Sequence, residues 1–104
     1  MAVVVAYVPD LIDRSKVAAL GEVRFVSRAA DLATAAQEAA AELVVVDLGA
    51  PGAVDALPAV EARTIGYGRH TAVDLLETAR AAGCDEVLTR AEFFARLERG
   101  GLTT

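Results

Sequence analysis

Five short runs of strand-forming residues alternate with segments rich in alanine and leucine, and this alternation limits the fold more than any other feature. The runs cover residues 3–8, 23–26, 43–47, 64–67 and 86–88. Most are continuously apolar, which is typical of parallel strands covered on both faces. Because crossovers between parallel strands are right-handed, the pattern predicts five β-α units in one sheet with helices on both sides.

The segments between the runs carry signals for helix ends. Asp10 can cap the first helix, and Thr71 can cap the fourth, which Gly83 ends. The third helix, around residues 53–60, is expected to be short because Pro58 interrupts it. A last helix is expected within "AEFFARLERG", close to the end of the chain.

Length, charge and cysteine content exclude several classes of protein. A chain of 104 residues can bury one core but not two, so we expect a single domain over residues 1–99 and a frayed tail over 100–104. A net charge of -5 disfavours nucleic acid as a partner. No apolar run approaches the ~18 residues of a membrane span. The single cysteine, Cys84, is expected to be a packed thiol in a cytoplasmic protein.

Several polar residues directly follow the predicted strands. Asp47 ends the third run. Arg69 and His70 follow the fourth run, and Arg90 follows the fifth. Ligands of open parallel sheets bind outside the carboxyl ends of the strands, so the three basic residues are candidate contacts for a phosphoryl group or another anion. Because His70 is the only histidine and no cysteine pair exists, no zinc site is expected.

Two stretches resemble the receiver domains of response regulators. "ELVVVDLGAPG" resembles the third strand of that family with its phosphoacceptor aspartate and Pro-Gly loop. "ARAAGCDEVLTRAEFFARL" resembles the fourth helix, fifth strand and fifth helix. The resemblance extends from Val3 to about Leu97. It implies a flavodoxin-like (βα)5 three-layer sandwich, with a parallel sheet in the order 2-1-3-4-5 and Asp47 at the position of the phosphoacceptor.

Other positions depart from the pattern of the family. The resemblance places its acidic metal-binding pair at Ala6 and Tyr7, which cannot bind Mg²⁺ there. It places the phosphoryl-binding hydroxyl at Gly68 and the conserved lysine at Arg90. Phosphotransfer in the usual manner is therefore not expected, and neither is a resident cofactor. Mg²⁺ would be needed only if Asp47 is phosphorylated.

Three aspartates have alternative interpretations. Asp10, Asp13 and Asp47 could hold a displaced metal ion if the first loop were rebuilt, but helix capping explains the first two more simply. Asp47 could be a residual phosphoacceptor. We expect instead a fixed pair between Asp47 and Arg90, because the planar guanidinium suits a bidentate carboxylate contact. Such a pair would hold the domain in one state.

Receivers often dimerise or bind effectors through the fourth helix, fifth strand and fifth helix. By this resemblance Leu75, Leu76 and Phe94 are candidate interface residues, either in a homodimer or with another protein. Ordinary core packing is the alternative for all three residues.

The leading hypothesis is a stand-alone degenerate receiver, a signalling or scaffolding module that works through protein contacts and is not an enzyme. The first alternative is a phosphorylatable single-domain response regulator with Asp47 as acceptor. The second is a small flavodoxin-like ligand-binding protein or enzyme that uses Asp47, Arg69, His70 and Arg90 at the sheet edge.

Overall fold

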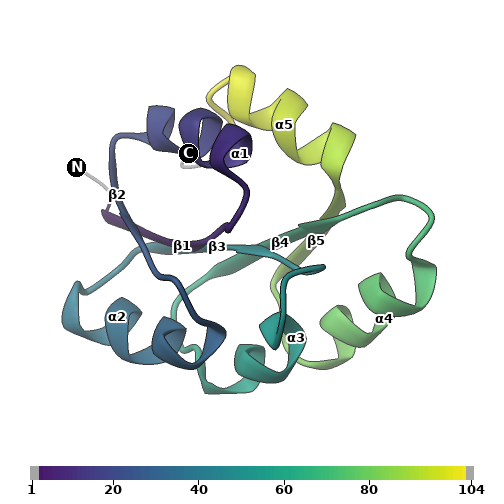
Figure 1. Cartoon of the computed structure of the whole chain (residues 1–104), viewed down its shortest axis with the longest axis horizontal. Helices are drawn as coiled ribbons and strands as arrows, with labels where there is room; N and C mark the ends of the chain where they lie inside the picture. Colours follow the sequence, from purple (N-terminus) through teal and green to yellow (C-terminus); the bar gives the residue numbers. More distant parts are fainter. Residues whose placement is uncertain (1–2, 103–104) are drawn as a thin grey trace.

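The computed structural model describes residues 3–102 and contains one parallel five-stranded sheet (Figure 1). Neighbouring strands follow the order β2-β1-β3-β4-β5, which confirms the predicted topology. The predicted strand ends differ from the observed ones by at most one residue. The strands are β1 (Val3–Tyr7), β2 (Glu22–Phe25), β3 (Leu43–Asp47), β4 (Thr64–Gly68) and β5 (Glu86–Thr89).

Helices cover both faces of the sheet. Figure 1 shows α1 and α5 on one face and α2, α3 and α4 on the other, which gives the expected three layers. No helix within residues 3–102 is long and apolar enough to cross a membrane. The helices are α1 (Leu11–Val17), α2 (Leu32–Glu38), α3 (Ala53–Ala56), α4 (Val73–Ala81) and α5 (Arg90–Glu98), with 3-10 turns η1 (Ala18–Leu20), η2 (Ala29–Asp31) and η3 (Leu57–Ala59).

The predicted start of the first helix and the short third helix are confirmed. The Oδ1 of Asp10 accepts the backbone N–H groups of Ile12 and Asp13, so Asp10 caps α1. The third helix is short, because α3 gives way to the 3-10 turn η3 that contains Pro58. The prediction for Thr71 is wrong: α4 begins after Ala72, without a side-chain cap.

The central strands separate two apolar cores. Along β1, Val4 and Ala6 face the core beneath α1 and α5, whereas Val5 and Tyr7 face the core beneath α2, α3 and α4. Because successive side chains of a strand point to opposite faces, a strand buried on both sides must be continuously apolar. Cys84 is buried in the second core, which confirms its predicted packing.

The carboxyl half of β4 lies close against the segment that follows β3. A Cβ atom added at Gly66 would lie 2.7 Å from the Cδ2 and 2.9 Å from the Cγ of Leu48, which is itself buried. Position 66 therefore does not accept a side chain without displacing Leu48.

Replacing Gly66 with alanine is expected to lower the free energy of unfolding by about 2 kcal/mol, because the new methyl group overpacks the core at Leu48. Urea denaturation followed by circular dichroism measures this change. Gly49→Ala is the control, since its Cβ would lie 3.5 Å from the nearest atom, an ordinary contact. Equal effects of the two substitutions would contradict the assigned contact at Gly66.

The chain after α5 is packed as far as Leu102, so the prediction of a frayed tail is wrong for residues 100–102. The Leu102 side chain is 0% exposed in the core beneath α1 and α5. Its carbonyl accepts a hydrogen bond from Arg63 at 3.1 Å, and the Gly101 N–H donates to the Arg96 carbonyl at 2.9 Å. Residues 103 and 104 lie outside the described part of the chain.

Candidate functional site

A cleft of about 560 Å³ opens at the carboxyl edge of the sheet. It brings together Asp47, Arg69 and Arg90, three of the residues that follow the strands. His70 lies outside this cleft, in a neighbouring depression of about 330 Å³ that Arg69 and Arg90 also line. The lining residues of the larger cleft, called the edge cleft below, are Asp10, Asp13, Asp47, Gly49, Gly68, Arg69, Ala72, Leu75 and Arg90.

The strongest polar contact in the edge cleft joins Arg90 to Asp13. Two guanidinium nitrogens of Arg90 donate to the two carboxylate oxygens of Asp13, at 2.8 and 2.9 Å. The Tyr67 hydroxyl donates to the same carboxylate at 3.0 Å. The predicted pair between Asp47 and Arg90 is therefore wrong. Because α1 and α5 cover the same face of the sheet, Arg90 at the start of α5 meets the buried carboxylate on α1 instead.

This contact is anchored in the core. The Asp13 side chain is 3% exposed and that of Arg90 is 42% exposed. The guanidinium of Arg90 also lies 5.5 Å from the ring centroid of Tyr67 and 5.2 Å from that of Phe94. The hydrogen bonds from Arg90 hold the pKa of Asp13 below its usual value, and the contact with Asp13 raises the pKa of Arg90. Burial, with the nearby carboxylates, raises the pKa of Tyr67. We call Asp13, Arg90 and Tyr67 the α1–α5 clasp.

Asp47 lies at the end of β3, half-buried, and takes no part in the α1–α5 clasp. Its Oδ1 accepts the backbone N–H of Gly49 at 3.0 Å. Among the described residues it forms no ion pair. Burial raises the pKa of Asp47, the bond from Gly49 partly offsets this rise, and the charge of Asp13 adds to it. Asp47 therefore presents to the edge cleft a carboxyl group that forms no ion pair within residues 3–102, although the charge of Arg90 also acts on it and lowers its pKa.

The aspartates at this edge do not fit a divalent cation. Asp10 is engaged as the cap of α1, and both oxygens of Asp13 accept bonds from Arg90. Asp10 and Asp47 each keep one oxygen without a hydrogen-bond donor from residues 3–102, and two such oxygens are fewer than the several ligands that Mg²⁺ requires in octahedral array. Within that range no three His, Cys, Asp or Glu side chains are grouped to hold a metal ion.

The other positions singled out by the resemblance have structural roles. Ala6 is fully buried, and the Tyr7 hydroxyl donates to the Pro51 carbonyl at 2.8 Å. Gly68 is buried, and a Cβ atom there would lie 3.1 Å from the Cδ2 of Leu76. A hydroxyl-bearing side chain at position 68 therefore requires Leu76 to move.

The three candidate interface residues differ in exposure. Leu76 is 7% exposed and belongs to the core, so its assignment as an interface residue is wrong. Leu75 is half-buried and lines the edge cleft. Phe94 is half-buried, with its ring 5.3 Å from that of Tyr67 and the Lys16 ammonium 5.0 Å above it. Its ring thus covers the α1–α5 clasp.

Sequence reasoning missed Asp13 and Tyr67 as members of this network. The signal for Asp13 was its spacing of four residues from Val17, because residues four apart share one face of a helix. Both are buried on the inner face of α1. Tyr67 was visible only as a strand residue between two glycines, and nothing in the sequence specifies the partner of its hydroxyl group.

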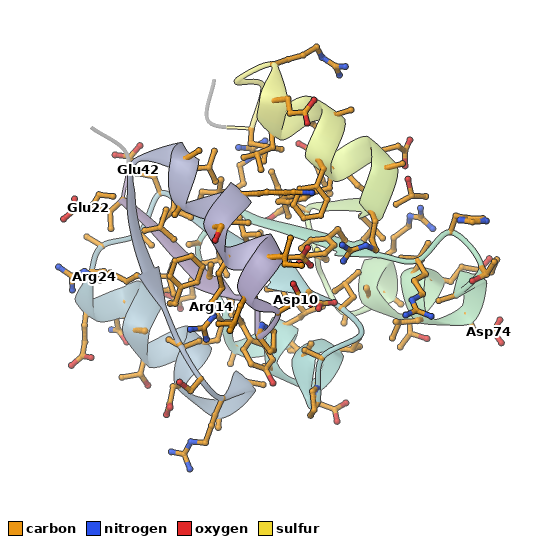
Figure 2. All side chains as sticks on the ribbon, turned by 45° about the horizontal axis from the view of Figure 1, so that its top comes forward. Asp10, Arg14, Glu22, Arg24, Glu42 and Asp74 are labelled. Atoms are coloured by element: carbon orange, nitrogen blue, oxygen red, sulfur yellow. The ribbon has the colours of Figure 1, made fainter. Side chains whose placement is uncertain are left out.

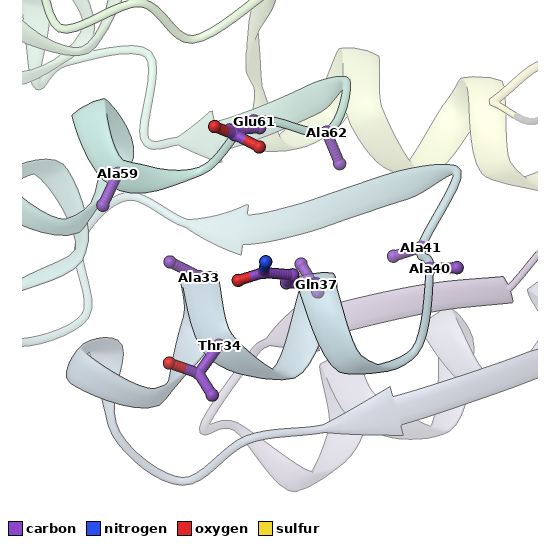
Figure 3. Close-up of a pocket in the computed structure, with 9 residues that line it drawn as sticks. Ala33, Thr34, Gln37, Ala40, Ala41, Ala59, Glu61 and Ala62 are labelled. Atoms are coloured by element: carbon purple, nitrogen blue, oxygen red, sulfur yellow. The ribbon is translucent and has the colours of Figure 1, made fainter.

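A second cavity, of about 400 Å³, lies between α2 and the segment before β4 (Figure 3). Glu61 is the only charged residue among those that line it, and six of the others are alanines. Glu61 is its single titratable group, and no base lies among the other lining residues to activate the hydroxyl group of Thr34. The residues that line it are Ala33, Thr34, Ala36, Gln37, Ala40, Ala41, Ala59, Glu61 and Ala62.

Comparison with known proteins finds likeness in structure only. No family model and no curated protein matches the chain. A response regulator from Hahella chejuensis superposes with a TM-score of 0.80 and 18% identity, over 95% of this chain and 91% of the other. The BeF3-activated DrrB receiver domain superposes with a TM-score of 0.70 and 21% identity, over 96% and 97% of the two chains.

The chain has the receiver fold. NtrX from Brucella abortus, in complex with ADP, adds a third example with a TM-score of 0.76 and 19% identity. There the match covers 97% of this chain but 26% of the longer protein. A receiver fold is thus formed here by a sequence that shares about one residue in five with these structures.

Proposed function

We propose that this chain is a signalling or scaffolding module that works through protein contacts, and that it does not carry out the usual Mg²⁺-dependent phosphotransfer. The receiver fold supports the signalling part of the proposal. The contact between Arg90 and Asp13 supports the rest, and it is the observation on which the proposal depends.

Phosphorylation of an aspartate needs groups that offset the charge of the transferred phosphoryl. An anionic carboxylate that attacks an anionic phosphoryl group requires positive charge from a metal ion and from a basic side chain. Here the basic residue at the relevant position, Arg90, donates to Asp13 rather than to Asp47. The aspartates do not fit a cation, and position 68 offers no hydroxyl group. Asp47 therefore lacks each of the groups that stabilise the transferred phosphoryl.

A second candidate function is favoured by one observation. Because Arg90 is held by Asp13, the Asp47 carboxyl group is not paired with it and lines an open cleft. A small phosphodonor can therefore approach it. The second candidate is a single-domain response regulator with Asp47 as acceptor and with charge compensation from Arg69, which lines the same cleft.

A phosphorylation experiment separates the two candidates. The purified chain is incubated with Mg²⁺ and acetyl phosphate, and its intact mass is measured beside that of a phosphorylatable receiver domain treated in the same way. We expect no phosphoryl adduct on this chain. An adduct that forms on the unaltered chain and is absent in Asp47→Asn would overturn the proposed function in favour of the second candidate.

A further inference from the structure

We propose that the edge cleft binds a segment of a partner protein in which a lysine or arginine, directed toward Asp47, is flanked by apolar residues. This inference rests on the proposed function, because it names the surface through which such a module holds its partner. It depends on the rim of the cleft, on its floor and on the distribution of charge around it.

Three exposed apolar side chains stand beside residues that line the edge cleft, and we call them its rim. Leu11, Ile12 and Val73 are 76%, 69% and 55% exposed, and they are the exposed large hydrophobic side chains of the described chain. Leu11 and Ile12 directly follow Asp10, which lines the cleft, and Val73 directly follows Ala72, which also lines it. Single exposed hydrophobics are ordinary on a protein surface, but their collection around one cleft is typical of a protein contact site.

The rim has two sides that belong to different layers of the fold. Leu11 and Ile12 begin α1, on one face of the sheet, and Val73 begins α4, on the other face. In Figure 2 Asp10 marks the start of α1 and Asp74 marks the start of α4. A segment that crosses the cleft between these two helix starts would cover apolar side chains at both ends of its path.

The floor of the cleft supplies the polar contact. Asp47 is half-buried and one of its oxygens has no donor among residues 3–102, since the Gly49 N–H bonds the other. A lysine or arginine of the partner would form with this carboxyl group the ion pair that Arg90 forms with Asp13 instead. Hydrogen bonds between charged groups are stronger than neutral ones, particularly where water is partly excluded.

The charges around the cleft favour a basic partner. Asp13 and Arg90 neutralise each other, which leaves Asp10, Asp47 and Arg69 among the lining residues. These three residues together carry one net negative charge, and the whole chain carries a net charge of -5. Electrostatic complementarity of this kind selects a partner of opposite charge and accelerates its association.

Selection from a display library of random short peptides tests the proposal on the full chain. We expect the enriched peptides to share a lysine or arginine next to apolar residues. A synthetic copy of the best peptide is then titrated by fluorescence anisotropy. Asp47→Asn and Ile12→Ser are each expected to weaken its binding by about tenfold, because they remove the polar anchor and part of the apolar rim.

Glu42→Gln is the matched control. It removes one exposed carboxylate, as Asp47→Asn removes one from the cleft, but Glu42 precedes β3 and so lies at the opposite edge of the sheet. It should change the affinity by less than about twofold. Enriched peptides without a basic residue, the absence of any enriched sequence, or equal affinities of Asp47→Asn and the unaltered chain would each overturn the proposal.

Analytical ultracentrifugation of the same variants tests the competing occupant, a second copy of this chain. A dimer that Ile12→Ser converts to monomer would show that the rim contacts another copy, and would overturn the proposal. Failure of the proposed function is detected separately, because a phosphoryl adduct on Asp47 increases the intact mass of the chain. Peptide binding to the unphosphorylated chain is measured independently of it.

Discussion

Replacing Arg90 with methionine is expected to lower the free energy of unfolding by about 3 kcal/mol, since it leaves a buried carboxylate without its counter-charge. Asp13 is 3% exposed and accepts two of its hydrogen bonds from Arg90. The Tyr67 hydroxyl would remain as a neutral donor, which offsets only part of the loss. Methionine keeps most of the aliphatic volume over the rings of Tyr67 and Phe94, so the change isolates the charge.

Because Asp13 is buried and Arg90 is partly exposed, replacing Asp13 should lower the free energy of unfolding less than replacing Arg90 does. Asp13→Asn should cost about 1 kcal/mol, because the Arg90 side chain is 42% exposed and can turn its charge toward water. Urea denaturation at neutral pH measures both variants. Arg28→Met is the control, since Arg28 and its partner Asp31 are 76% and 50% exposed and such pairs contribute at most about 0.5 kcal/mol. A cost for Arg90→Met no larger than that of Arg28→Met would contradict the α1–α5 clasp.

The pKa of Asp13 gives this prediction a pH dependence. Because the pKa of Asp13 is lowered in the folded chain, its contribution to stability is complete above the ordinary value of 3.8 and is lost as the pH falls through the lowered value. The stability difference between the unaltered chain and Arg90→Met should therefore be constant near neutral pH. It should shrink as the pH falls into the acid range, because without Arg90 the burial of Asp13 raises the pKa of this carboxyl group and the variant takes up a proton at a higher pH than the unaltered chain. A difference that stays constant down to strongly acid pH would contradict the role of the Asp13 charge.

The fold could be predicted from the sequence because its signals are local and repeated. Each central strand must be apolar at every position when both of its faces are covered, and "VVVD" in β3 satisfies this without any knowledge of its neighbours. Pro58 limits α3 by the same local logic. The strand order could not be predicted from such local signals. It followed from the resemblance to receiver domains, which depends on whole motifs.

For the candidate site, the sequence predicts only the edge of the sheet at which it lies. The position of Asp47 at the end of β3 is fixed by strand topology, and so is its presence in the edge cleft. The partner of Arg90 is decided by burial, because Asp13 and Asp47 both lie within the same cleft. Which carboxylate is more deeply buried depends on the rotation of α1 against the sheet. That rotation is a property of packing, not of residue order.

The burial of Leu102 also could not be predicted from the sequence. Gly100 and Gly101 indicate a turn or a disordered end equally well, and a single leucine after them forms no periodic pattern. In the folded chain Gly100 adopts a φ of +71°, and the chain turns so that Leu102 enters the core beneath α1 and α5. Only the space available in that core determines whether a terminal apolar residue is buried.

Leu102→Ala is therefore expected to lower the free energy of unfolding by about 3 kcal/mol, because a fully buried leucine is truncated and a cavity remains. The hydrogen bond from the Arg63 guanidinium to the Leu102 carbonyl is kept, so the substitution tests the Leu102 side chain alone. Leu11→Ala makes the same chemical change at a side chain that is 76% exposed and should alter stability by less than about 0.5 kcal/mol. If urea denaturation finds the two variants equally stable, Leu102 is not part of the core in solution.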